Sequence, residues 1–151
     1  MSNLAEVMRK NVKSVKHTSP ISEAAQLMKQ EKVSALLVKQ NNEFVGILTD
    51  TDIVRKGVAE SKDLTSMTVG SIMTTPFVTI ESHQSPGEAQ EMMSNEGVRH
   101  LVVREGKTIT GVVSIRDLLV FYKQRAEPTY SEPRIGIDYP IVILATHRVQ
   151  E

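Results

Sequence analysis

Two short stretches of the chain carry the same polar spacing, Gly-x-x-Thr/Ser-x-x-Asp. They comprise Gly46, Thr49 and Asp52, then Gly111, Ser114 and Asp117. In each stretch the hydroxyl is expected where a strand ends and a helix begins. Free N–H groups in the first turn of a helix favour phosphate, and a hydroxyl adds one more donor. An ionised aspartate only accepts hydrogen bonds, which suits the neighbouring hydroxyls of a ribose.

The same spacing also describes a helix cap. A hydroxyl at the start of a helix and an acid three residues later can satisfy each other's backbone N–H groups without any ligand. Glycine on the preceding strand allows either a flat base or another backbone to come close. The spacing therefore leaves two interpretations open for Thr49 with Asp52 and for Ser114 with Asp117.

Both stretches belong to an internal repeat. Met8 matches Met73, an offset of 73 − 8 = 65 residues, and this register continues until Asp52 matches Asp117. One local slip of a single residue occurs at the Ser-Pro pairs that begin at Ser19 and Ser85. Chance similarity seldom keeps one register over such a length, so we infer a duplication.

Each copy predicts a short helical lead-in, then a strand, a helix, a two-stranded hairpin and a closing helix. Apolar spacing, Ser-Pro helix starts and polar turns place these elements. The predicted strands and closing helices are 12–15, 35–38, 44–48 and 51–58, then 77–80, 101–103, 109–113 and 116–124. The predicted fold class is α/β (α+β), with motifs at 1–62 and 63–125 and a tail at 126–151. Units of about 60 residues are marginal alone, so the two are expected to share a core.

Bulk properties exclude several classes of function. The 18 basic and 18 acidic residues balance, which argues against general nucleic-acid binding. No cysteine is present, and the four histidines lack metal-binding spacing. No nucleophile with a plausible base is visible, so we expect no enzyme and no catalytic or metal residue. Neither a secretory signal nor a run of about 20 apolar residues appears, so we expect a cytoplasmic protein without membrane contact.

The repeat resembles the CBS family, named for the regulatory domain of cystathionine β-synthase. The resemblance rests on Glu-Ala-x-x-x-Met, Val-x-x-Leu-x-Val and Gly-x-x-Thr/Ser-x-x-Asp, in that order and twice. It implies two β-α-β-β-α motifs about a pseudo-twofold axis, further dimerisation, and two clefts for adenosine-containing ligands. AMP, ADP or ATP is then the expected regulatory ligand, no cofactor is required, and the signal passes to a separate protein. The alternative is a structural or protein-interaction module with empty clefts.

The resemblance also implies which residues bind the ligand. The hydroxyl and the acid carry over to Thr49 and Asp52, and to Ser114 and Asp117. Base-contacting segments map to 11–15 and 75–79, and to Ser34-Ala35 and Arg99-His100. The ligand-binding residues predicted from these segments and from the basic groups nearby are Thr75, Pro76, Phe77, Val78, Arg99, His100 and Arg116.

The two copies differ at these positions. We predict that Arg99, His100 and Arg116 join Ser114 and Asp117 in one better nucleotide site, because cationic groups can bind phosphate oxygens. The first copy has Asp50-Thr51 where the second has Ile115-Arg116, and an acid facing the ligand would repel polyphosphate. A second possibility is that the clefts are joined across the pseudo-twofold axis, so that basic groups of one copy serve the ligand of the other.

Two further features depart from the repeat pattern. Many family members carry proline in the second strand, where this chain has Leu37 and Val102. The tail contains Pro128, Pro133 and Pro140, which forbid a long helix. We expect either an extended tail lying on its own module or an arm for dimerisation or partner docking, with residues 141–144 adding a strand to a sheet edge.

Overall fold

A computed structural model describes residues 2–125 of the chain, and it confirms the order β-α-β-β-α in both repeats. The chain divides into two compact units, residues 1–119 and residues 120–151. The first repeat contains η1 (Leu4–Glu6), β1 (Ser14–Lys16), α1 (Ile21–Glu31), β2 (Ala35–Gln40), β3 (Glu43–Thr49), α2 (Asp50–Asp52) and the π-helical η2 (Ile53–Val58). The second contains η3 (Val69–Ser71), β4 (Thr79–Glu81), α3 (Pro86–Glu96), β5 (His100–Glu105), β6 (Thr108–Ser114) and α4 (Ile115–Arg125).

Each repeat forms a three-stranded sheet with the same pairing. In the first sheet, β1 runs parallel to β2, and β2 forms an antiparallel hairpin with β3. Strands β4, β5 and β6 repeat this arrangement. Val38 pairs with Gly46 and Val103 with Gly111, and an irregularity in the pairing follows directly after both. The duplication in the sequence is therefore a duplication of strand register as well.

The starts of α1 and α3 differ because of the slip at the Ser-Pro pairs. Ser85 and Glu88 form a capping box at the start of α3, with the Glu88 N–H donating to Ser85 Oγ at 3.1 Å. Pro20 occupies the equivalent cap position of α1 and supplies no side-chain bond. The Ile21 N–H instead donates to the Met67 carbonyl at 3.0 Å. The backbone carbonyl of Met67 thus takes the place of a side-chain cap at the start of α1.

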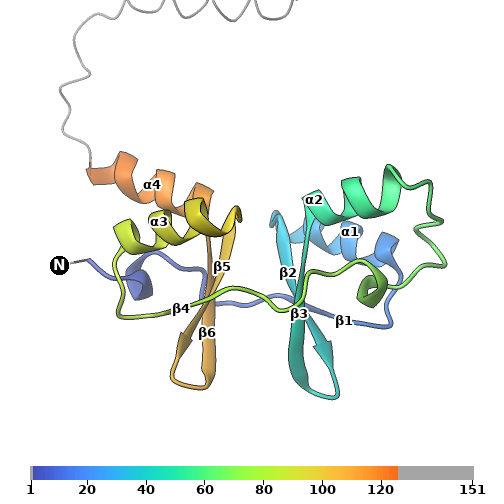
Figure 1. The fold of residues 1–151 in the computed structure, drawn as a ribbon, viewed down its shortest axis with the longest axis horizontal. Helices are drawn as coiled ribbons and strands as arrows, with labels where there is room; N and C mark the ends of the chain where they lie inside the picture. Colours follow the sequence, from blue (N-terminus) through green and yellow to red (C-terminus); the bar gives the residue numbers. More distant parts are fainter. Residues whose placement is uncertain (1, 126–151) are drawn as a thin grey trace, which may run out of the picture. The chain divides into compact units, whose positions relative to one another are not determined.

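The lead-in of each repeat packs into the core of the other repeat. Val69 and Ile72 are buried among the first repeat's residues, whereas Leu4 is buried among those of the second. Between lead-in and sheet, residues 9–13 and 74–78 cross from one half to the other, and Figure 1 shows both segments running between the sheets. We call these stretches the crossing segments. The boundary between residues 62 and 63 separates the two motifs in the sequence. The hydrophobic cores do not divide there, because each contains residues from both motifs.

The crossing explains why the first strand of each repeat begins later than predicted. Val12 and Phe77 were expected to start the strands, but β1 begins at Ser14 and β4 at Thr79. Both side chains pack instead into a third core between the sheets. Their apolar character therefore reflects burial between the repeats rather than strand pairing.

This third core confirms the expectation of a shared interior. Its buried residues are Leu37, Ile47 and Val102. Matching positions of the two repeats contribute together: Leu37 with Val102, Ile47 with Val112, Val12 with Phe77, and Phe44 with Ile109. A twofold interface brings equivalent patches together in this way. The repeats are thus related by a pseudo-twofold axis, and Leu37 and Val102 are buried in the core between them.

Part of the second unit is also described. The rings of Phe121 and Tyr122 meet edge to face with centroids 5.4 Å apart, and the Arg125 guanidinium lies 3.8 Å from the Phe121 centroid. The predicted strand at residues 141–144 and the docking arm lie outside the described residues. Within residues 2–125, no helix is long and apolar enough to cross a membrane.

Gly46 and Gly111 mark the places where the crossing segments touch the hairpins. Thr74 pairs with Ile47, and Arg9 pairs with Val112, through two backbone hydrogen bonds in each case. A Cβ at Gly111 would lie 2.7 Å from the Arg9 carbonyl oxygen and 2.7 Å from Met8 Sδ. The glycine is therefore required by an approaching backbone, one of the two reasons the sequence suggested.

Gly111→Ala is expected to destabilise the fold by about 1–3 kcal/mol, because the crossing segment must move away from β6. Urea unfolding would measure the loss. Gly87→Ala is the matched control, since its Cβ would have no neighbour closer than Ser85 Oγ at 3.8 Å. Equal stability of the two variants would show that the close approach is not required.

Candidate functional site

Two clefts lie between the repeats of the first unit, and each takes residues from both. The Asp117 cleft has a volume of about 440 Å³ and combines Ser114, Arg116 and Asp117 with residues 11–13 and 34–35. The Asp52 cleft has a volume of about 560 Å³ and combines Thr49, Thr51, Asp52 and Arg55 with residues 76–78 and 97–100. Both volumes are typical of small-molecule sites, which span about 300–1,000 Å³.

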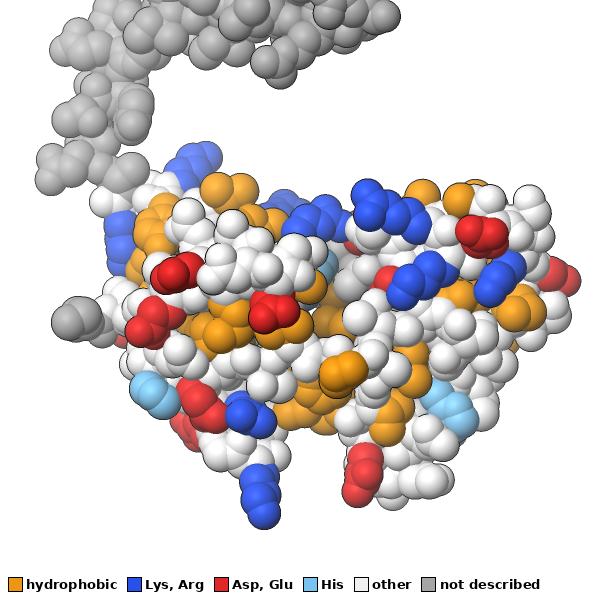
Figure 2. All heavy atoms as spheres, viewed as in Figure 1, with side chains coloured by type: hydrophobic (Ala, Val, Ile, Leu, Met, Phe, Trp, Pro, Cys, Tyr) orange, Lys and Arg blue, Asp and Glu red, His pale blue; other side chains and the backbone are white. Residues whose placement is uncertain are grey.

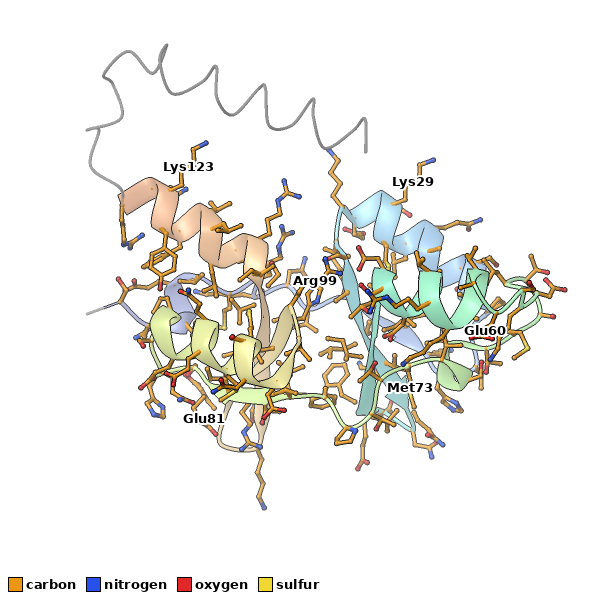
Figure 3. All side chains as sticks on the ribbon, turned by 45° about the horizontal axis from the view of Figure 1, so that its top comes forward. Lys29, Glu60, Met73, Glu81, Arg99 and Lys123 are labelled. Atoms are coloured by element: carbon orange, nitrogen blue, oxygen red, sulfur yellow. The ribbon has the colours of Figure 1, made fainter. Side chains whose placement is uncertain are left out.

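The prediction that Arg99, His100 and Arg116 surround one ligand is wrong. Arg99 lines the Asp52 cleft, Arg116 lines the Asp117 cleft, and His100 lines both. Figure 3 shows Arg99 between the two halves. The crossing segments and the starts of β2 and β5 meet at the pseudo-twofold axis, so each acid faces the strand start of the other repeat. The second possibility, clefts joined across the axis, is the one the geometry supports.

The other predicted positions divide similarly. Pro76, Phe77 and Val78 line the Asp52 cleft, but Thr75 lines neither cleft. The Thr75 hydroxyl donates to the Val45 carbonyl oxygen at 2.8 Å, so this side chain holds the crossing segment on β3.

Sequence reasoning missed several basic residues that line the clefts. Arg9, Lys29 and Lys32 line the Asp117 cleft, and Arg55 lines the Asp52 cleft. A comparison of the two repeats for unmatched cations could have found them, because none has a basic residue at its matching position.

Both hydroxyl–acid pairs form helix caps. The Asp52 N–H donates to Thr49 Oγ1 at 3.1 Å, and the Thr49 N–H donates to Asp52 Oδ2 at 3.0 Å. Ser114 and Asp117 make the same two bonds at 3.1 and 2.9 Å. The capping interpretation is thus confirmed in both repeats. Each cap uses mainly Oδ2 of the acid, and the two acids differ in what contacts Oδ1.

Oδ1 of Asp52 is already occupied. It lies 3.0 Å from Lys56 Nζ and 3.0 Å from Thr74 Oγ1. Lys56 Nζ also donates to the Ile72 carbonyl at 3.2 Å, which holds the ammonium in place. The Asp52 side chain is 8% exposed. These contacts tie helix α2 to the crossing segment and leave little acceptor capacity for a ligand.

Oδ1 of Asp117 is much less committed. Within residues 2–125 its one recorded contact is Arg9 Nε at 3.4 Å. That distance is longer than the roughly 2.7–2.9 Å of a strong charge-assisted hydrogen bond. The Arg9 side chain is 51% exposed, which leaves it room to move. The two residues that bind Asp52 have no equivalents around Asp117. At the offset of 65, Thr74 is matched by Arg9 and Lys56 by the uncharged Phe121. Asp117 thus keeps an acceptor for a ligand hydroxyl.

Charge also separates the clefts. Five cationic side chains and one acid line the Asp117 cleft, a formal net charge of four, whereas two cations and one acid line the Asp52 cleft. Figure 2 shows Lys and Arg side chains gathered at the top of the seam between the halves. Arg99 is further occupied by Asp50 Oδ1 at 3.1 Å and Thr51 Oγ1 at 2.6 Å. Asp50 thus binds Arg99 and does not line the cleft.

His100 connects the two clefts. Its Nε2 lies 2.7 Å from Ser34 Oγ across the seam. Burial first, and the neighbouring Arg99 second, lower the pKa of His100 below its ordinary value. The lowered pKa favours the neutral imidazole, which suits the hydrogen bond with Ser34. Within residues 2–125, no group of three or more His, Cys, Asp or Glu is arranged to hold a metal ion.

Comparison with known proteins agrees with this architecture. The CBS domain model matches residues 4–59 and 69–123. The CBS domain-containing protein YhcV of Bacillus subtilis is 32% identical over 80% of this chain and 85% of its own length.

Solved structures give the same result. A putative signal-transduction protein with CBS domains from Burkholderia ambifaria is 26% identical, with a TM-score of 0.79 over 83% of this chain and 97% of its own. A hexameric CBS-CP12 protein from bloom-forming cyanobacteria is 31% identical, with a TM-score of 0.73 over 78% of this chain and 66% of its own. Two matched domains, a shared fold and similar relatives show that the chain belongs to the CBS-domain family.

Proposed function

We propose that this chain is a regulatory module that senses an adenosine-containing nucleotide, of the AMP, ADP or ATP class, in the Asp117 cleft. The observation that carries the proposal is the weakly engaged Oδ1 of Asp117 in a cleft of strong positive charge. A carboxylate with free acceptor capacity suits a ribose diol, and surrounding cations suit phosphate. We assign the module no reaction, no required cofactor and a cytoplasmic location.

The lining of the Asp117 cleft supports a defined orientation of the nucleotide. Val12, Ala35 and Val112 supply apolar surface for the base. Asp117 accepts from the ribose, and Arg116 follows Ser114 at the start of α4, where free helical N–H groups favour phosphate. Apolar surface with a few placed polar groups is the usual composition of a small-molecule site.

The Asp52 cleft favours the alternative role, that of a structural element. Asp52 caps α2 and binds Lys56 and Thr74, so it fastens the crossing segment to the first repeat. We therefore propose that the two halves have diverged, with one acid recognising the ligand and the other holding the fold.

Regulation then follows from the shared construction of the cleft. A nucleotide in the Asp117 cleft touches both repeats, so it binds one arrangement of the repeats more tightly than another. Such differential affinity shifts the population towards the favoured arrangement. A separate partner protein that recognises this arrangement would receive the signal.

Asp117→Ala should lower AMP affinity at least about tenfold, equivalent to the loss of one charged hydrogen-bond acceptor of about 1.4 kcal/mol or more. Asp52→Ala should leave AMP affinity nearly unchanged but lower stability by about 1 kcal/mol more than Asp117→Ala, because it also releases Lys56 and Thr74. Calorimetric titration and urea unfolding measure the two effects.

The two variants control each other, since both remove the same capping contact. Equal losses of AMP affinity would contradict the asymmetry between the clefts. A thermal-shift panel of AMP, ADP, ATP, NAD and S-adenosylmethionine tests the function itself, because a ligand of the native state raises the melting temperature. No response to any of them would favour the structural role for both clefts.

We further propose that the chain forms a homodimer through exposed aliphatic side chains. Val54, Val58 and Leu119 are 57%, 57% and 64% exposed, and Val54 matches Leu119 in the repeat. Exposed aliphatic residues at matching positions of a pseudo-twofold unit suit a symmetric interface.

Val54→Glu combined with Leu119→Glu should convert the dimer to a monomer, because association would bury two charges in each subunit. Light scattering of the full chain measures the mass. Lys107→Glu, an exposed change in the turn between β5 and β6 and outside this surface, should leave the dimer intact. A wild-type chain that is already monomeric at high concentration would contradict the dimer.

A further inference from the structure

The cations of the Asp117 cleft have no counterparts in the other half. They are Arg9, Lys13, Lys29, Lys32 and Arg116. The residues that match them at the offset of 65 are Thr74, Val78, Ser94, Gly97 and Thr51. None of these is charged. Val12, Val33 and Val112 of the Asp117 cleft do match apolar residues of the Asp52 cleft, so the excess of positive charge is what distinguishes the two clefts.

Three of these cations are available to a ligand. Arg9 lies 3.4 Å from Asp117, and Lys13 lies 3.4 Å from Glu31. Lys29, Lys32 and Arg116 are exposed and form no hydrogen bond or ion pair with another residue of the described chain, 2–125. Arg116 lies on α4, whereas the two lysines lie at the C-terminal end of α1, where Figure 3 labels Lys29. The free cations thus come from both repeats.

The backbone at Lys32 gives a second, independent indication. Lys32 ends α1 in the left-handed conformation, with φ 56°. Gly97 ends α3 at the matching position with φ 65°. This conformation favours glycine, because a Cβ is disfavoured there. The first repeat therefore keeps a lysine where its backbone prefers glycine.

We propose that Lys29, Lys32 and Arg116 form a polyphosphate-binding rim that makes the Asp117 cleft select nucleoside di- and triphosphates over monophosphates. The inference rests on the proposed nucleotide site. Arg116 adjoins Asp117 in sequence and meets the phosphate next to the ribose. Each further phosphate extends towards the lysines of α1 and gains a charge-assisted contact. The Asp52 cleft offers a single further cation, Arg55, because Arg99 is bound by Asp50 and Thr51.

The test exchanges the rim for the residues of the other repeat. The variant Lys29→Ser, Lys32→Gly, Arg116→Thr gives the Asp117 cleft the residue types found at the matching positions of the other repeat. Calorimetric titration of the full chain with adenosine, AMP, ADP and ATP at constant salt gives four affinities. For wild type, affinity should rise with each added phosphate and reach about tenfold or more between AMP and ATP. In the variant this gain should fall to about twofold or less, and AMP affinity should fall too because Arg116 meets its phosphate, while affinity for adenosine, which has no phosphate, should be unchanged.

A matched control removes the same charge elsewhere. Lys16→Ser, Lys62→Gly and Lys107→Thr lie outside both clefts and should keep the wild-type gain with phosphate number. Inorganic triphosphate should bind more weakly than ATP, because it has no ribose for Asp117. Equal affinities of wild type for AMP and ATP, or an equal loss in the control variant, would overturn the rim while leaving the nucleotide site standing. Failure of all four adenosine ligands to bind would instead overturn the proposed function, and the rim with it.

Discussion

The close passage of each crossing segment over the opposite hairpin is the constraint on which the molecule depends. At Gly111 the Arg9 carbonyl occupies the space of a side chain, and at Gly46 Met73 and Thr74 do the same. These approaches place the lead-in of each repeat in the core of the other, so neither half has a complete interior by itself. The mixed composition of both clefts follows directly, because the crossing segments form part of their walls.

On this symmetric frame the side chains create an asymmetric electrostatic environment. The third core is built from matching positions, which keeps the pseudo-twofold relation. The positions around the two acids need not match, since they contribute little to that core. Lys56 and Thr74 bind the acid of the first repeat, whereas Arg9 approaches the acid of the second repeat only loosely. A duplicated scaffold can thus keep one fold and specialise two clefts.

The helix caps show how a structural and a binding role can share one side chain. Capping engages Oδ2 of both aspartates. Whether the second oxygen is available is decided by residues distant in sequence, namely 56 and 74 in one case and 9 in the other. A cap and a ligand site are therefore not exclusive interpretations of the Gly-x-x-Thr/Ser-x-x-Asp spacing.

The sequence alone determined the duplication and the order of elements, because these depend on spacing along the chain. It predicted a shared core from the small size of each repeat, and it left capping and ligand binding open for both hydroxyl–acid pairs. It also identified Asp52 and Asp117 as the two candidate ligand-binding acids. It could not assign Arg99 and Arg116 to different clefts, since that depends on the crossing of the chain at residues 9–13 and 74–78. For the same reason it placed the first strands too early. Lys29 and Lys32 stand out in the sequence as cations without a match in the other repeat, but only packing places them in a cleft. Only the tertiary structure decided which residues of one repeat face the acid of the other, because those neighbours are brought together by packing across the pseudo-twofold axis and not by separation along the chain.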